Sequence, residues 1–295
     1  MVKLEWYHGH QSRLFAETGF FYFYTPKEAP RLNNVSNYYE MIDEDSRFSR
    51  NSRKTEFLTT THVLDEILPH GAKILDVGAG AGAYSFHYAA REHEVVAVDL
   101  TPKHIEIIRE KSKQTGIKLE AYVENATDLS RFETGVFDLV TCFGPMYHLT
   151  DVNDRYCCIR ECLRVLKTGG HLAIAYINKY SVIPMLATRD QKFIRDSVID
   201  KVLTDGVIFA GDQDCFWTDA YFTSPDEIER LLGAYGVTPV DHVGTDGISH
   251  TIQEYVDKLS AEEFDAWLSY HFQTCRERTI LGISTHGLYI CQKNR

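Results

Sequence analysis

Short apolar runs alternate with amphipathic segments through the middle of the chain. Several runs have the length and β-branched content of strands: KILDVG (73–78), EVVAVDL (94–100), KLEAYVEN (118–125), FDLVTCFG (137–144) and HLAIAYI (171–177). The segments between them carry apolar residues at helical spacing, and prolines or glycines stand where those helices should start or stop. Strands that alternate with helices in this way predict a parallel, doubly wound α/β sheet.

The alternation changes after Ile177. We predict one more helix at SPDEIERLLGAYG (224–236) and two more strands at VTPVDHVG (237–244) and HGLYICQK (286–293). The remaining segments, about 178–223 and 247–280, have mainly helical patterns. The predicted fold is therefore a Rossmann-like, doubly wound, mostly parallel sheet of seven strands. The two segments are expected as helical lid insertions over the carboxyl edge of the sheet, where ligands of such folds bind.

The chain is divided into an N-terminal segment and one large domain. Residues 1–70 are predicted to form a helical segment that covers the ligand site, although only KTEFLTTTHVLDEIL (54–68) has a clear helical pattern. Residues 71–295 are predicted to form the domain itself. Within it, the helix VNDRYCCIRECLRVLKTGG (152–170) should end at its Gly-Gly pair.

Composition and charge narrow the class of protein. Hydrophobic residues make up 44% and charged residues 25% of the 295 residues, as in ordinary globular proteins. The net charge of −11 argues against nucleic acid as a partner, because nucleic acid is bound by basic surfaces. The start of the chain lacks the apolar run of a signal peptide, and no stretch of 18 apolar residues predicts a membrane span. We therefore expect a cytoplasmic protein with no membrane association.

The cysteines and histidines give no metal motif. There are seven cysteines and no CxxC pair, which suits a reducing compartment. Cys158 and Cys162 lie one helical turn apart and could form a thiol pair, but no third ligand has a useful spacing. His250 and His286 are scattered, although His286 begins a strand and could reach the site. The prediction is that the chain has no metal site.

The segment DVGAGAGA (76–83) is a glycine-rich turn between a strand and a helix, and it fits two cofactor templates. Gly78, Gly80 and Ala83, with Asp99 further along, satisfy the dinucleotide pattern GxGxx(G/A). Asp76, Gly78, Gly80 and Gly82 equally satisfy (D/E)xGxGxG. Both cofactors need glycines because a Cβ atom would block the close approach of the backbone.

Asp76 separates the two templates. Its carboxylate would repel a pyrophosphate but attract the ammonium and sulfonium groups of S-adenosylmethionine. The alternative is that Asp76 only caps the glycine turn. With Asp76 included, the pattern favours the sulfonium cofactor.

The turn and the segments after it resemble the class I S-adenosylmethionine-dependent methyltransferases. The segments VVAVDL, ENATDLS, FDLVTCFGPMYHLTD and ECLRVLKTGG follow in the order of that family's motifs, over roughly residues 55–177. The segment GPMYHL further resembles a bacterial subgroup that acts on small molecules. The resemblance implies S-adenosylmethionine as cofactor and a set of cofactor-binding residues: Asp76, Gly78, Ala79, Gly80, Gly82, Asp99, Leu100, Asn125, Ala126 and Phe143.

The resemblance also implies individual roles. Asp99 would bind the ribose hydroxyls, and Leu100 would lie beside the adenine. The family usually has an acidic residue where this chain has Asn125, whose amide oxygen can still accept from the adenine amino group.

Tyr147 and His148 are the candidate catalytic residues because they follow the fourth strand, where the methyl group should point. His148 could deprotonate an acceptor, since its unperturbed pKa lies near neutrality. Packing is an equally good explanation for both residues. Aromatic residues in the covering segments are candidates for contacts to the sulfonium or the acceptor, although core packing explains each of them more simply: Tyr38, Tyr39, Trp217, Tyr221 and Phe222.

The predicted function is methyl transfer from S-adenosylmethionine to a small-molecule acceptor by in-line displacement. Two alternatives remain open at this point. One is an NAD-dependent oxidoreductase, which Asp76 opposes, and the other is a non-catalytic module that binds the cofactor. The acceptor and the nucleophilic atom do not follow from the sequence, because one fold serves many chemistries.

Overall fold

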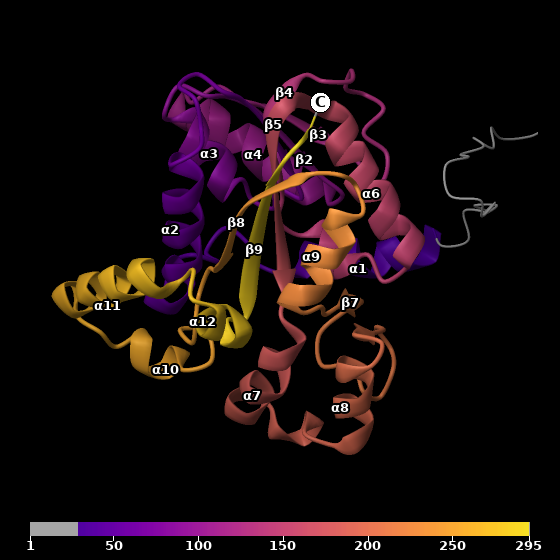
Figure 1. Cartoon of the computed structure of the whole chain (residues 1–295), viewed down its shortest axis with the longest axis vertical. Helices are drawn as coiled ribbons and strands as arrows, with labels where there is room; N and C mark the ends of the chain where they lie inside the picture. The colour runs from indigo at the N-terminus through magenta and orange to yellow at the C-terminus, as the bar shows by residue number, and fades with distance from the viewer. Residues whose placement is uncertain (1–28, 295) are drawn as a thin grey trace, which may run out of the picture.

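A computed structural model describes residues 29–294 of the chain (Figure 1). Its main sheet has seven strands in the order β3-β2-β1-β4-β5-β9-β8. The strands are β1 (Lys73–Val77), β2 (Glu94–Asp99), β3 (Glu120–Val123), β4 (Phe137–Cys142), β5 (Leu166–Ile177), β8 (Thr238–Gly244) and β9 (His286–Gln292). Strands β1 to β5 pair in parallel, and β9 runs antiparallel to both β5 and β8. The predicted seven-stranded, mostly parallel sheet is confirmed.

Helices precede, connect and follow the strands. They are α1 (Ala29–Met41), α2 (Asn51–Asp65), α3 (Ala83–Ala89), α4 (Pro102–Thr115), α5 (Pro145–His148), α6 (Val152–Val165), α7 (Lys179–Arg189), α8 (Asp196–Leu203), α9 (Pro225–Gly233), α10 (Gln253–Val256), α11 (Ala261–Thr274) and α12 (Arg278–Ile283), with a short 3-10 turn at Gln191–Phe193. None of the helices within residues 29–294 has both the length and the apolar character needed to cross a membrane.

Two helical layers enclose the sheet (Figure 1). On one face, α6 and α9 bury Ile159 and Leu232 against alternate strand residues such as Leu75 and Val140. On the other face, α2 and α3 pack against Ile74 and the opposite set of strand residues. This alternation explains why nearly every residue of β1 and β2 is buried, and hence why these strands appear in the sequence as continuous apolar runs.

Several helix boundaries follow from local sequence signals. Helix α4 begins with Pro102 and ends before Gly116, which adopts the left-handed φ of +73° that favours glycine. Helix α9 begins with a capping box in which Ser224 and Glu227 each accept a hydrogen bond from the other's backbone NH group. The predicted starts of both helices and the end of α4 are confirmed, whereas α9 ends at Gly233, before the expected stop at Gly236.

The predicted end of the helix at 152–170 is wrong. Helix α6 ends at Val165, and the Gly-Gly pair lies inside β5. The pairing of β4 with β5 shifts register between Phe137 and Leu139, and a Cβ atom at Gly170 would lie 3.0 Å from the backbone oxygen of Asp138. The glycines therefore allow an irregularity in the sheet and do not stop the helix.

The two predicted insertions differ in where they lie. Helices α7 and α8 pack together below the sheet with a two-stranded sheet of β6 (Val207–Ile208) and β7 (Ala220–Tyr221), which the sequence did not indicate. Helices α10 and α11 pack against α2, and α12 packs against β8 (Figure 1). The aromatic FFYFY segment at 20–24, part of the predicted covering segment 1–70, lies outside the described residues.

Candidate active site

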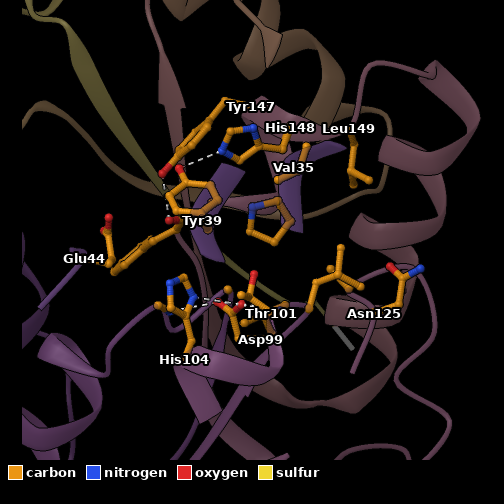
Figure 2. Close-up of a pocket in the computed structure, with 18 of the residues that line it drawn as sticks. Val35, Tyr39, Glu44, Asp99, Thr101, His104, Asn125, Tyr147, His148 and Leu149 are labelled. Carbon is orange, nitrogen blue, oxygen red and sulfur yellow. Dashed lines mark hydrogen bonds and ion pairs between the residues drawn. The ribbon is translucent and has the colours of Figure 1, made fainter. Parts of the chain in front are cut away.

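A cavity of about 700 Å³, open to solvent, lies at the carboxyl ends of β1, β2 and β4 (Figure 2). Most of the predicted cofactor-binding residues line it: Gly78, Gly80, Asp99, Leu100, Asn125, Ala126 and Phe143. Tyr147 and His148 line it as well. Figure 2 shows Tyr39, Tyr147 and His148 along one side of this first cavity and Asp99, Thr101 and His104 along the other.

The glycine turn forms the floor of the first cavity, and its geometry requires glycine. Gly78 has a φ of +78°, and a Cβ atom there would lie 2.6 Å from Cδ of Pro145. Gly82 has a φ of +85°, and its Cβ atom would lie 2.8 Å from Cγ1 of Ile108 on α4. Gly82 therefore allows α3 and α4 to pack closely and does not line the cavity, and Ala79 does not line it either.

Asp99 ties the turn to the end of β2. One carboxylate oxygen accepts from the Gly80 NH at 2.8 Å, and the other accepts from the Thr101 NH at 2.8 Å and lies 3.1 Å from Nδ1 of His104. Nε2 of His104 is buried and has no partner among residues 29–294, although His104 lines the cavity. His104 is therefore a site residue that the sequence analysis did not identify. Its position in a helix does not show that its polar side chain is buried and faces the cavity.

Asp76 lies behind the glycine turn and does not line either cavity. Its carboxylate accepts from the hydroxyl of Ser85 at 2.6 Å and from that of Thr141 at 2.9 Å. Burial raises its pKa from 3.8 to about 6, and the two hydroxyl donors oppose that rise. Asp76 is therefore largely ionised at neutral pH, but its direct contact with a cofactor stays a prediction.

Asn125 and Ala126 lie where the sequence placed them, after β3. The side-chain oxygen of Asn125 accepts from the backbone NH of Thr127 at 3.0 Å. One lone pair of that amide oxygen is thus already used, and the second is available for a ligand.

The two candidate catalytic residues have different surroundings. The Tyr147 hydroxyl donates to the backbone oxygen of Phe143 at 3.0 Å, and burial raises its pKa to about 12. Nδ1 of His148 lies 2.9 Å from the backbone oxygen of Asp219, so this nitrogen must carry the proton. Nε2 of His148 then accepts from the hydroxyl of Tyr39 at 2.9 Å. Burial lowers the pKa of His148 to about 4, so the ring is neutral at physiological pH.

Tyr39 comes from α1, far from His148 in sequence. Its ring meets that of His148 edge-on at 5.4 Å, and burial raises its pKa well above the usual value. The sequence analysis named Tyr39 only among the aromatic residues of the covering segments. Of the other aromatic residues in that group, Trp217 packs 4.9 Å from the His148 ring, and Phe222 is buried in the cluster around α7 and α8.

A second cavity of about 320 Å³ adjoins the first. Arg47, Phe143 and Tyr147 line both cavities, whereas Glu56, Thr245 and His286 line only the second. Arg47 donates to Glu44 at 3.1 Å and to Glu56 at 2.8 Å, so its guanidinium group joins a carboxylate of the first cavity to one of the second.

Two clusters of metal-ligating side chains occur within residues 29–294. Cys142, at the end of β4, joins Cys158 and Cys162 of α6, with ligand atoms within 4.8 Å of one another. The third ligand that no sequence spacing revealed is thus supplied by a neighbouring strand, although all three thiols lie fully buried in the apolar core. Asp246, His250 and His286 form the second cluster, so the two histidines are not scattered in space.

Comparison with known proteins identifies the domain. Residues 74–170 match the family described as "Methyltransferase domain". Over these residues the chain is similar to methyltransferases. The ubiquinone biosynthesis O-methyltransferase of Xanthomonas axonopodis pv. citri (strain 306) is 32% identical over 133 residues, which are 45% of this chain and 54% of that protein. The protein of the same name from Xanthomonas oryzae pv. oryzae (strain PXO99A) is 33% identical over 124 residues, covering 42% and 51%.

The chain spans about half the length of the curated relatives it matches. Among solved structures, an SAM-dependent methyltransferase from Methanosarcina mazei has a TM-score of 0.55 at 22% identity and covers 79% of this chain and 97% of that one. The PH0226 protein from Pyrococcus horikoshii OT3 has a TM-score of 0.57 at 19% identity, with 88% and 99% covered. These structures confirm the fold of the methyltransferase domain. The subgroup suggested by GPMYHL stays a prediction.

Proposed function

We propose that this chain transfers a methyl group from S-adenosylmethionine to a hydroxyl group of a small-molecule acceptor. One observation carries the proposal: a single cavity joins the glycine turn and Asp99 to the Tyr39–His148 hydrogen bond. The names of the Xanthomonas relatives, O-methyltransferases of ubiquinone biosynthesis, support oxygen as the nucleophile. The cytoplasmic location remains a prediction.

The glycine turn fits the methionine end of the cofactor. Gly78 and Gly80 line the cavity with φ angles of +78° and +55°, so their backbone lies open to a ligand without a Cβ atom between. Side chains at these positions would fill part of the space that the ligand needs. The charge is also suitable, because Asp76 behind the turn and Glu44 beside Gly80 both favour a cationic ligand.

Asp99 and its neighbours would bind the ribose. Three of the lone-pair positions of the Asp99 carboxylate are occupied by Gly80, Thr101 and His104, which leaves capacity for one more donor. Nε2 of His104 is unpartnered among the described residues and is a second group for a ribose hydroxyl. Leu100, Asn125 and Ala126 would contact the adenine.

The cofactor supplies a methyl group activated by the sulfonium. The protein aligns the acceptor with that methyl group and excludes water, and proximity provides much of the rate acceleration. As the acceptor oxygen forms its new bond to carbon, its O–H bond must break. We infer that this proton passes to the Tyr39 oxygen while the Tyr39 proton passes to Nε2 of His148, which becomes an imidazolium.

The pKa values favour a hydroxyl acceptor over an ammonium. With a pKa of about 4, His148 is too weak a base to deprotonate an alkylammonium ion before the transfer. It can accept the proton of an oxygen that becomes strongly acidic as it is methylated. Transfer to a thiol or an amine is an outcome that the assay below distinguishes.

The first test is thermal unfolding of the purified chain with S-adenosylmethionine, S-adenosylhomocysteine or NAD. A ligand at about 100 times its Kd should add roughly 2.7 kcal/mol to the free energy of unfolding. We expect stabilisation by the two sulfur ligands only, and its loss in Asp99→Asn. Stabilisation by NAD alone would establish the oxidoreductase alternative and overturn the proposal.

A second measurement separates an enzyme from a binding module. The protein is incubated with methyl-labelled cofactor and small phenols, alcohols, thiols and amines, and label transfer is measured. We expect transfer to hydroxyl compounds. Cofactor binding without transfer to any class would support the non-catalytic alternative.

A further inference from the structure

The cluster of Asp246, His250 and His286 lies beside the second cavity, at the carboxyl edge of the sheet. His286 is the first residue of β9 and pairs with Ile177, the last residue of β5. Nδ1 of His286 lies 2.7 Å from Oδ2 of Asp246, and Nδ1 of His250 lies 3.8 Å from the same oxygen. His250 and His286 stack with their ring centroids 5.4 Å apart.

Glu56 of α2 brings a second carboxylate to this cluster. Its Oε2 lies 3.7 Å from Nδ1 of His286, while its Oε1 accepts from Arg47. The four side chains are between 2% and 10% exposed. Segments far apart in the chain therefore place two imidazoles and two carboxylates around one buried point.

Several polar atoms of this cluster lack partners. Within residues 29–294, neither Nδ1 nor Nε2 of His250 has a hydrogen-bond partner, although the side chain is only 6% exposed. Oε2 of Glu56 is buried and unpaired in the same way. Buried polar atoms are rarely left unpaired, because each costs free energy of about 1–3 kcal/mol. A ligand that accepts electron pairs from both residues would remove this cost.

The charges around the cluster are compatible with a cation. Asp246 and Glu56 carry two negative charges, and Arg47 is shared between Glu56 and Glu44. Arg189 donates to the backbone oxygen of His250 and to the side chain of Gln253. Arg53 also lies close enough to act on His250 electrostatically, and it is the group that opposes a cation most directly.

We propose that Asp246, His250 and His286 bind one divalent transition-metal ion at the wall of the second cavity, with Glu56 as a further ligand. Two imidazoles and one carboxylate suit Zn²⁺, Fe²⁺ or Co²⁺, whereas Mg²⁺ and Ca²⁺ prefer oxygen ligands. The ligand atoms of the three residues lie within 4.8 Å of one another, so binding needs only small side-chain movements. The proposal does not depend on methyl transfer.

The test is a titration of the purified, chelator-treated full chain with Zn²⁺, Co²⁺ and Mg²⁺, without methyl donor or acceptor. Calorimetry should give one equivalent of Zn²⁺ and no measurable binding of Mg²⁺. Co²⁺ should give a visible absorption spectrum typical of nitrogen and oxygen ligands. His250→Gln removes no hydrogen bond of the described structure, so it should fold normally and bind Zn²⁺ at least tenfold more weakly.

Matched variants make the result specific. His93→Gln changes a histidine that contacts the Ala72 NH at the opposite edge of the sheet, and it should bind Zn²⁺ as the unmodified chain does. Asp246→Asn should weaken binding as His250→Gln does, because it removes another ligand. Folding of each variant is followed by circular dichroism.

Two results would overturn the proposal. If no Zn²⁺ binds, the Asp246–His286 hydrogen bond holds the cluster together and the cluster is not a metal site. If Zn²⁺ binds equally to His250→Gln but not to Cys158→Ser, with a cobalt–thiolate band, the ion belongs to the cysteine cluster.

Discussion

The two cavities are built in different ways. The first cavity is lined largely by short segments that directly follow β1, β2, β3 and β4, so each contribution is marked by a local motif. The second cavity is lined by one or two residues each from α2, α3, β5, β9 and the segments after β4 and β8, together with Arg47. Parallel strands bring their carboxyl ends together as a property of the fold, whereas the second cavity depends on how helices pack over the edge.

Hydrogen bonding differs less, because Nε2 of His104 in the first cavity also lacks a partner among the described residues. In the first cavity, Asp99 is satisfied by backbone NH groups of its own turn and of the glycine turn. Beside the second cavity, His250 and Glu56 retain buried atoms without partners in the described part of the chain.

The largest effect is expected in the first cavity, in His148→Gln. Loss of a general base typically lowers the rate by about 10²–10⁴-fold. The Kd of S-adenosylmethionine, measured by calorimetry, should stay within a few-fold. Tyr39→Phe should also lower kcat, and the double variant should be little worse than the single variants because the residues act as one unit.

The control is Tyr88→Phe. The buried Tyr88 hydroxyl has no partner within residues 29–294, so its removal should leave kcat unchanged. If His148→Gln keeps full activity, the proton does not pass through this pair.

Gly78→Ala should act on the first cavity. The new Cβ atom would lie 2.6 Å from Cδ of Pro145, so the turn and the start of α5 must move apart. The alanine would also have to keep a φ of +78°, which is strained for any residue with a Cβ atom. We expect about 100-fold weaker binding of S-adenosylmethionine, equivalent to roughly 2.7 kcal/mol. Gly71→Ala is the matched control, because Gly71 has a φ of +66° with no atom within 4 Å. Its cost should be limited to about 1–2 kcal/mol of stability, measured by urea unfolding, with unchanged cofactor affinity.

Asp76→Asn should change the pH dependence of stability. The folded pKa of Asp76 is about 6, above its usual 3.8, so between these values the folded state holds a proton that the unfolded state has lost. Stability contributed by this group is therefore lost as pH rises through the window, by at most about 3 kcal/mol. The asparagine variant should be as stable as the unmodified chain near pH 4 and more stable at pH 7.5.

Urea unfolding at several pH values measures this difference. His148, with its lowered pKa, acts in the opposite direction in the same window, but its contribution is common to both proteins and cancels. The same variant should bind S-adenosylmethionine more weakly, because the carboxylate no longer attracts the cation. Equal pH dependence in the two proteins would contradict a raised pKa for Asp76.

The smallest effects are expected from removing the two carboxylate partners of Arg47 one at a time, which compares the roles of the two cavities. Arg47 and Tyr147 line both cavities, and Tyr147 is the neighbour of His148 on the acceptor side of the first. Glu56→Gln frees Arg47 from its partner beside the second cavity, so it should disturb this side and raise KM for the acceptor about tenfold, or 1.4 kcal/mol, with little change for the cofactor. Glu44→Gln removes the partner of Arg47 beside Gly80, and should instead weaken the binding of the cofactor. Steady-state kinetics with each substrate varied measures both. If both variants change the same constant, the cavities do not have separate roles.

Local patterns determined much of this protein. The apolar runs at 73–78 and 94–100 predicted β1 and β2 because strands buried on both faces need continuous apolar residues. The glycine turn and Asp99 identified the first cavity because backbone conformation and strand-end position are local properties. The sequence by itself thus determined a mostly parallel sheet of seven strands and the resemblance to methyltransferases.

Only the tertiary structure decided which distant residues meet. Tyr39 reaches His148 because α1 packs over the strand ends, and Cys142 completes the thiol cluster because β4 lies against α6. Asp246, His250, His286 and Glu56 come together because β8, β9 and α2 converge at one edge. No spacing in the sequence encodes these distances, since they depend on how helices and strands pack, and packing is a property of the whole fold.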